Sequence, residues 1–281
     1  MYLQPTENLS MKKLATLATA AMLSFGLAMP ASAVELDTVI DAEHRQESAK
    51  RDEYRHPQAT LDFFEIKPDM TVVEIWPGGS GWYTEILAPY LRDAGTLYTA
   101  HVNPKAGDYY KKSRAQFEKK LTSEPERYDH VKITTFDPPK LIDIAPEGSA
   151  DRVLTFRNIH NWYQKGGGDE RVLAAFQAFY KVLKPGGMLG VVEHRLPADQ
   201  DKQSQEASGY MHQAYVVDMA KKAGFELVEA SEINANPKDK ANHPDGVWSL
   251  PPGLRAGEKN RDKYQAIGES DRMTLKFKKA E

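Results

Sequence analysis

Six consecutive residues, 157–162, combine a cation, two amides, an imidazole and an indole. They directly follow a short apolar run over 152–156 that is typical of a buried strand. An imidazole titrates near neutrality, so His160 is a candidate general base for an oxygen or nitrogen nucleophile. The alternative is that His160 and Asn158 only hold a loop through hydrogen bonds to the backbone. The density of polar groups favours catalytic roles for His160, Arg157 and Asn158, with Asn161 and Trp162 binding the substrate.

A second polar pair follows the next predicted strand, Met188–Val192. His194 and Arg195 are expected at the same rim as His160, because ligands of open α/β sheets bind at the carboxyl ends of the strands. His194 is a candidate substrate contact. Arg157 and Arg195 could clamp a carboxylate or phosphate with two hydrogen bonds each, or they could pair with acids nearby.

A glycine-rich turn, 77–81, lies between a predicted buried strand, Met70–Trp76, and a helical pattern, Trp82–Leu91. Glycines let the backbone approach a ligand closely, and the amino terminus of the following helix offers free N–H groups to an anion. Tyr83 lies in the first turn of that helix and is a candidate to reach the pocket.

All four tryptophans fall in segments expected near the strand ends, namely Trp76, Trp82, Trp162 and Trp248. Together they indicate an aromatic wall that could stabilise a sulfonium or another cation, although core packing is the alternative for each one. Arg55 and His56, which precede a predicted helix, are expected to fold over the same rim and contact the substrate, or else to cap that helix. His160, His194 and His212 belong to separate elements, so the spacing predicts no metal site.

Further apolar strands are predicted at 96–100 and 131–135, and helical patterns such as Glu170–Leu183 separate the strands. This alternation predicts a parallel sheet with helices on both faces. A helix over 214–223 and two strands, 225–230 and 272–278, indicate an antiparallel edge. The long connection between those strands, 232–269, contains Trp248 and is predicted to be a lid.

Three segments, VVEIWPGGSGWYTEIL, VLKPGGMLGVVEH and AKKAGFELVE, resemble the class I S-adenosylmethionine-dependent methyltransferases over residues 57–281. The YRHP, WPGGSGWYTEILAPYL and LTFRNIHNWY variants look like a small group of exported bacterial methyltransferases. The resemblance implies a Rossmann-like, doubly wound, mostly parallel sheet of seven strands in the order 3-2-1-4-5-7-6, with the last strand antiparallel.

The resemblance also implies a cofactor, S-adenosylmethionine, and the residues that bind it. Glu74, Gly78, Gly79 and Gly81 match the loop around the methionine part of the cofactor, and Asp137 matches the acid that reaches the adenine. The chain departs from the family at two cofactor-binding positions. Trp76 stands where a glycine is common, and His101 followed by Asn103 replaces the acid that holds the ribose.

Composition excludes several classes of protein. The chain has 281 residues without cysteine, which excludes a catalytic thiol, a zinc–thiolate site, an iron–sulfur cluster and any disulfide. Lysine and arginine total 37 against 40 acidic residues, for a net charge of -3, so nucleic acid is not an expected partner. A mean hydropathy of -0.60 excludes a multi-span membrane protein.

The first 33 residues have the pattern of a secretory signal. A basic Met11-Lys12-Lys13 precedes an apolar run over 14–28, and Ala31-Ser32-Ala33 fits a peptidase site. We expect cleavage after Ala33, export to the periplasm and no lasting membrane insertion, since the apolar run is too short to span a bilayer. Met11 is a possible true start. The mature chain would comprise an exposed helical extension, 34–56, and the domain over 57–281.

These observations give one leading hypothesis and two alternatives. The first is an exported S-adenosylmethionine-dependent methyltransferase that acts on a small molecule. The second is a periplasmic small-molecule binding protein that keeps the fold without methyl transfer. The third is a different enzyme chemistry based on the His160 cluster.

Overall fold

The computed structural model of the chain describes Met1 and residues 34–280, so the predicted signal segment lies, apart from Met1, outside the described residues. Within 34–280, no helix is both long and apolar enough to cross a membrane. The strands are β1 (Thr71–Ile75), β2 (Thr96–Val102), β3 (Lys132–Phe136), β4 (Ala150–Phe156), β5 (Leu183–Leu196), β6 (Met211–His212), β7 (Phe225–Ser231) and β8 (Arg272–Lys279). The α-helices are α1 (Leu36–Ile40), α2 (Gln46–Ala49), α3 (Asp52–Arg55), α4 (Pro57–Phe63), α5 (Thr84–Leu91), α6 (Asp108–Ser123), α7 (Pro125–Tyr128), α8 (Ile159–Tyr163), α9 (Gly168–Val182), α10 (Ser204–Ser208), α11 (Gln213–Lys222) and α12 (Arg261–Ile267). Three 3₁₀ turns are η1 (Glu43–Arg45), η2 (Pro104–Ala106) and η3 (Gly246–Ser249).

The strands form one sheet in the order β3-β2-β1-β4-β5-β8-β7. β1 to β5 run parallel, whereas β8 is antiparallel to both β5 and β7. This confirms the predicted order and the antiparallel edge. The strand count differs by one because the two-residue β6, which pairs with the end of β5, is an addition to the predicted set.

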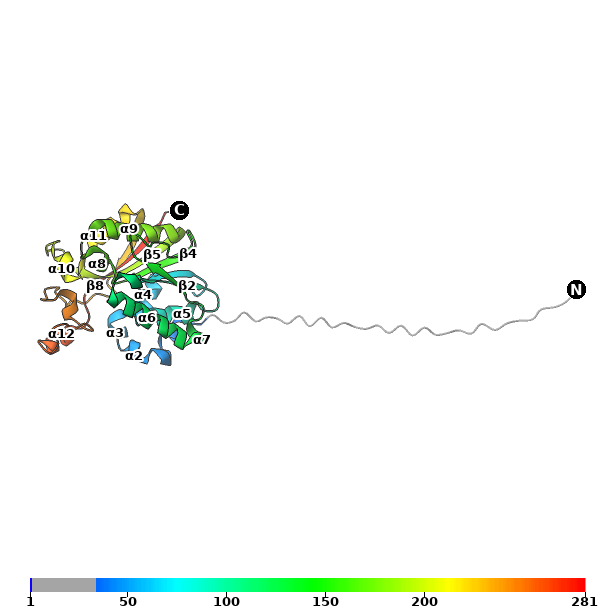
Figure 1. Cartoon of the computed structure of the whole chain (residues 1–281), viewed down its shortest axis with the longest axis horizontal. Coiled ribbons are helices and arrows are strands. Elements are labelled where there is room, and N and C mark those ends of the chain that lie inside the picture. Colours follow the sequence, from blue (N-terminus) through cyan, green and yellow to red (C-terminus); the bar gives the residue numbers. More distant parts are fainter. Residues whose placement is uncertain (2–33, 281) are drawn as a thin grey trace. The chain divides into compact units, whose positions relative to one another are not determined.

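Alternation along the strands creates two hydrophobic layers, one on each face of the sheet. Val73 and Val153 point into a core shared with α8, α9 and α11, while the neighbouring Val72 and Leu154 point into a core shared with α1, α4, α5 and α6. Figure 1 shows these two groups of helices on opposite sides of the strands. Coverage of both faces explains why the strands are so apolar.

The segment before the domain differs from its prediction. Instead of one exposed helix, residues 36–55 form α1, η1, α2 and α3, with Leu36, Val39 and Ile40 buried in the second core. Arg45 is also fully buried, donating to the carbonyl of Ile40 and pairing with Asp52 at 2.9 Å. The prediction of full exposure is wrong because the few apolar side chains of this segment pack into the second core, while most of its charged side chains stay at the surface.

The long connection between β7 and β8 is packed against the rest of the chain. It contains η3 and α12, and Val247, Leu250 and Tyr264 are buried within it. This packing brings Trp248 toward the carboxyl ends of the strands.

Candidate functional site

The carboxyl ends of β1, β4 and β5 lie side by side because these strands are parallel neighbours. Trp76 directly follows β1 and Arg157 directly follows β4, and both adopt a positive φ, 46° and 62°. A left-handed backbone is unfavourable for such large residues and is often found at functional sites. α8 begins two residues after Arg157 and places His160 beside the end of β5.

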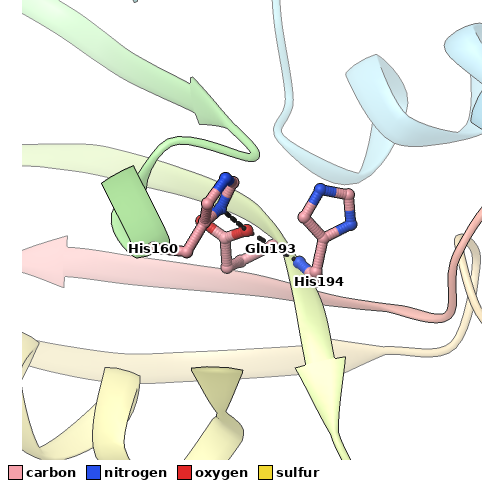
Figure 2. A group of neighbouring side chains, drawn as sticks. All are labelled: His160, Glu193 and His194. Carbon is pink, nitrogen blue, oxygen red and sulfur yellow. Dashed lines mark hydrogen bonds and ion pairs between the residues drawn. The ribbon is translucent and has the colours of Figure 1, made fainter. Parts of the chain in front are cut away.

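His160 is held by a buried carboxylate that we did not predict. Glu193 in β5 is fully buried and lies 3.0 Å from His160 Nδ1 (Figure 2). The same carboxylate accepts the backbone N–H groups of Ile159 at 2.6 Å and of His194 at 2.8 Å. Because Nδ1 donates to Glu193, the neutral His160 ring keeps its lone pair on Nε2, which has no hydrogen-bond partner among the described residues. The sequence signal for Glu193 was its place at the end of an apolar strand, directly before a histidine.

His194 lies beside His160, with 5.2 Å between the ring centroids (Figure 2). Its Nδ1 lies 2.5 Å from the hydroxyl of Ser270. Burial holds the pKa of His194 well below its ordinary value, and the nearby His160, Arg272, Arg157 and Arg55 act in the same direction. His194 is therefore neutral at physiological pH.

The two histidines belong to separate elements, yet they meet. The ligand atoms of His160, Glu193 and His194 all lie within 4.8 Å of one another, a spacing that a metal ion could bridge. His160 and His194 lie together, as expected for one rim, so their separate elements are no argument against a metal site. His212, in β6, is not part of the cluster.

Other predicted catalytic and substrate residues are packed in the interior. Asn158 donates to the carbonyl of Ile75 at 2.8 Å and so joins the ends of β1 and β4, which is the structural alternative considered for it. The Tyr83 ring stacks on Phe156 at 3.6 Å and is buried. Trp162 is fully buried in the core, and the Asn161 amide lies 3.5 Å from the Arg157 carbonyl.

The remaining predicted substrate contacts differ in their surroundings. Trp248 meets His160 edge-on with 6.0 Å between ring centroids. Arg55 is buried over the ring of Trp82 at 4.6 Å. His56 precedes α4 without a side-chain cap and borders a cavity of about 210 Å³. Arg195 pairs with Glu232 and Asp271 at 2.7 and 2.8 Å, so nearby acids already engage it.

The Trp76 side chain links the carboxyl ends of β1 and β3. Its indole Nε1 donates to the carbonyl of Phe136, the last residue of β3, at 2.9 Å. The ring also contacts Trp162 and Tyr110, with centroid separations of 5.7 and 6.0 Å. Phe136 directly precedes Asp137, the residue that the resemblance assigns to the adenine, so the indole is bonded next to the expected adenine contact.

The polar groups expected to hold the nucleoside are also engaged within the chain. The Asp137 carboxylate accepts hydrogen bonds from Asn103 and Arg171, both at 2.9 Å. His101 is fully buried, and this burial lowers its pKa to about 4. The neutral ring lies 3.2 Å from the carbonyl of Gly78 through Nε2. This arrangement places no acid at the end of β2, and the Nδ1 atom of His101 is buried without a hydrogen-bond partner.

The glycine turn packs against α6. A Cβ at Gly79 would lie 2.5 Å from the Gln116 side chain, and a Cβ at Gly81 would lie 2.8 Å from Phe117. Glu74 is buried and accepts a hydrogen bond from Thr84 at 2.6 Å, and burial raises its pKa to about 7. The polar groups that the resemblance assigns to S-adenosylmethionine are thus engaged within the chain, while a cavity of about 360 Å³ adjoins Asp137.

Comparison with solved structures identifies the fold of this chain. A methyltransferase from Aquifex aeolicus, described as dependent on S-adenosylmethionine, superposes with a TM-score of 0.54 and 13% identity, over 87% of this chain and 98% of the other. A putative sarcosine dimethylglycine methyltransferase from Galdieria sulphuraria superposes with a TM-score of 0.53 and 14% identity, over 87% of this chain and 91% of the other. The fold is that of the S-adenosylmethionine-dependent methyltransferases. The [4+2]-cyclase SpnF superposes equally well, with a TM-score of 0.53 and 16% identity over 80% of each chain. No known protein family and no curated protein matches the sequence.

At these identities the likeness defines the fold and leaves the reaction open. One of the similar structures is described as a cyclase, so the chemistry has to be argued from the side chains at the strand ends.

Proposed function

We propose that this protein is an enzyme that transfers a proton to or from a small molecule bound at the ends of β4 and β5. His160 Nε2 is the acid–base group and Glu193 is the positioning residue. The observation that carries this proposal is the contact between a fully buried carboxylate and His160 Nδ1, which leaves Nε2 without a partner among the described residues. A carboxylate in this place fixes the tautomer and stabilises the imidazolium that forms when Nε2 takes a proton.

The neighbours of His160 suit this role. Neutral His194 adds no charge that competes for the proton, and Trp248 covers the imidazole from the β7–β8 connection. Exclusion of water at such a site strengthens the interaction between Glu193 and a charged His160. The nucleophile of the substrate, an oxygen or a nitrogen, would lose its proton to Nε2.

Turnover of a mixture of small molecules tests the proposal without requiring the substrate to be named first. The mature chain is incubated with a bacterial metabolite extract, and mass spectrometry follows which compounds are consumed. We expect at least one compound to be consumed by the wild type and by His212→Asn but not by His160→Asn. Equal consumption by the wild type and His160→Asn would refute the assignment.

Methyl transfer from S-adenosylmethionine is the second candidate, and the fold favours it. Calorimetric titration of residues 34–281 with S-adenosylmethionine and its demethylated product separates the two candidates. We expect no micromolar binding to the wild type, because the Asp137 carboxylate is already engaged by Asn103 and Arg171. Micromolar binding that is lost in Asp137→Ala would make methyl transfer the leading function. Saturable binding of a small molecule without turnover would instead favour the binding-protein alternative.

We also propose that the chain is exported with cleavage after Ala33. The support is the basic, apolar and small-residue pattern of the first 33 residues. Cell fractionation and amino-terminal sequencing test this, with Val34 expected as the first residue of a periplasmic protein. An uncleaved cytoplasmic product would contradict it.

A further inference from the structure

Arg157 carries a guanidinium group without a partner among the described residues. Its backbone N–H donates to the carbonyl of Val192 at 2.7 Å, which fixes the residue between β4 and β5. Among residues 34–280, no side chain forms a hydrogen bond or an ion pair with its guanidinium. Burial lowers the pKa of Arg157 to about 10, and Arg272 acts in the same direction, yet the group stays charged at neutral pH. Arg157 is half-buried, and a partly desolvated charge without a partner favours a counter-ion.

Three more arginines share a single carboxylate in the same region. Glu269 pairs with Arg51 at 2.5 Å, with Arg55 at 3.6 Å and closely with Arg272. The Nε atoms of Arg55 and Arg272 are buried without a hydrogen-bond partner. Counting Arg157, four guanidinium groups lie around one paired glutamate, Glu269, so positive charge is in excess there. The nearby Glu193 carboxylate is already engaged by His160 and two backbone N–H groups.

The acids around this cluster do not remove the excess. Glu74 interacts with Arg157 at longer range, but its pKa of about 7 leaves it only partly ionised at neutral pH. Glu53 and Lys238, of opposite charge, both line the neighbouring cavity of about 210 Å³, together with Glu269 and Ser270.

Repulsion between the arginines of the cluster contributes to lowering their pKa values. Burial lowers the pKa of Arg55 well below its ordinary value, and repulsion from Arg157 lowers it further. Burial likewise lowers the pKa of Arg157, with repulsion from Arg272 and Arg51 added to it. A bound anion would relieve this repulsion.

The positive charge extends to the two histidines. Arg272, Arg157 and Arg55 all disfavour a proton on His194. A metal cation at His160, Glu193 and His194 would face the same repulsion, and the Glu193 oxygens already accept three hydrogen bonds. An anion would be attracted at this place, and the planar fork of an arginine suits a carboxylate or phosphate.

We infer that Arg157, supported by Arg55 and Arg272, binds a carboxylate or phosphate group of the substrate next to His160. This inference rests on the proposed function for the meaning of the site, but the binding itself does not require His160 to transfer a proton. The substrate is accordingly an anionic small molecule whose charged end lies at Arg157 and whose reacting end lies at His160 Nε2. Arg157 has a left-handed backbone, with φ 62°, a strained conformation that is often found at functional sites.

Thermal unfolding and calorimetry with inorganic phosphate and with acetate, at constant ionic strength, test the site in the mature chain. We expect one or both anions to raise the melting temperature of the wild type at millimolar concentration, since a ligand of the native state stabilises it. Arg157→Gln should weaken this binding by about tenfold or more, while Arg157→Lys keeps part of it. Arg195→Gln is the matched control, because Arg195 lies at the end of the neighbouring strand, β5, and is already engaged by Glu232 and Asp271.

The outcomes are distinct. Equal stabilisation of the wild type and Arg157→Gln would overturn the inference, and so would micromolar Zn²⁺ binding that depends on His160 and His194. Phosphate or acetate binding that persists in His160→Asn, combined with unchanged metabolite turnover in that variant, would support the anion site and refute the proton-transfer function. A preference for phosphate over acetate, or the reverse, identifies which anion the substrate carries.

Discussion

The indole of Trp76 donates a 2.9 Å hydrogen bond to the carbonyl of Phe136 and so joins the ends of β1 and β3. These strands are not neighbours, because β2 lies between them in the sheet. The side chain therefore spans the end of β2, where His101 is bonded to the glycine turn. One tryptophan thus links two strand ends at which the resemblance predicts a cofactor.

Two replacements of Trp76 separate the contribution of packing to stability from that of backbone strain. We expect Trp76→Ala to lower the free energy of unfolding by about 2–4 kcal/mol through lost packing. Trp76→Gly should be more stable than Trp76→Ala by about 1 kcal/mol, because glycine accepts φ 46° without strain. Trp82, which does not share the positive φ, is the control, and there alanine should be the more stable replacement. Denaturant unfolding measures the stability of the alanine and glycine variants at both positions. The explanation would be contradicted if the same replacement were the more stable one at both positions.

Loss of the Glu193 carboxylate should affect both stability and the His160 tautomer. Glu193→Gln replaces a buried acceptor of three N–H groups, so we expect a loss of about 2–4 kcal/mol. Nitrogen NMR of labelled histidine should show the proton on Nδ1 of His160 in the wild type and a mixture in the variant. Glu118→Gln, at an exposed ion pair with Arg114, should cost less than about 0.5 kcal/mol. An unchanged His160 spectrum in Glu193→Gln would remove the positioning role.

Glu74 should make the protein less stable as the pH rises. Burial raises its pKa from 4.5 to about 7, so the folded state holds the proton more tightly than the unfolded chain. The contribution is complete below pH 4.5 and is lost as the pH rises through 7, a change of about 3 kcal/mol. The difference in unfolding free energy between wild type and Glu74→Gln, measured across this range, should decline by that amount. A constant difference would show that the carboxyl does not titrate there.

Glu269 should act in the opposite direction. Its burial would raise the pKa, but Arg272, Arg55 and Arg51 outweigh it and hold the pKa at about 2. Its stabilisation is therefore complete above pH 4.5 and is lost as the pH falls toward 2. Glu269→Gln leaves buried guanidinium groups unpaired, so we expect a loss of about 3–5 kcal/mol at neutral pH. Added phosphate should recover more stability in this variant than in the wild type, and an equal recovery would argue against anion binding in the cluster.

The sheet was predictable because its signal is local. Apolar runs such as 70–76 and 188–192, separated by helical patterns, determine a doubly wound sheet almost by themselves. The path of the strands followed from the resemblance, and only the two-residue β6 was too short to leave a pattern.

The site was harder to predict because its contacts join distant parts of the chain. His160 and Glu193 are 33 residues apart, and Arg51 and Glu269 are 218 apart. Glu193 resembles one more residue of an apolar strand until the fold places α8 over it. Trp76 and Asp137 lie at the ends of β1 and β3, as the strand pattern predicts, but their contacts with Phe136, Asn103 and Arg171 left no signal in the sequence.

The Trp76 indole also changes how the fold responds to its surroundings. A dissociable cofactor stabilises a protein only in proportion to its free concentration. An aromatic ring tethered by its own backbone has a high effective concentration at its site under all conditions, and it cannot be diluted away. The indole is therefore held beside Asp137 at a constant effective concentration, whereas the contribution of any dissociable ligand varies with its supply.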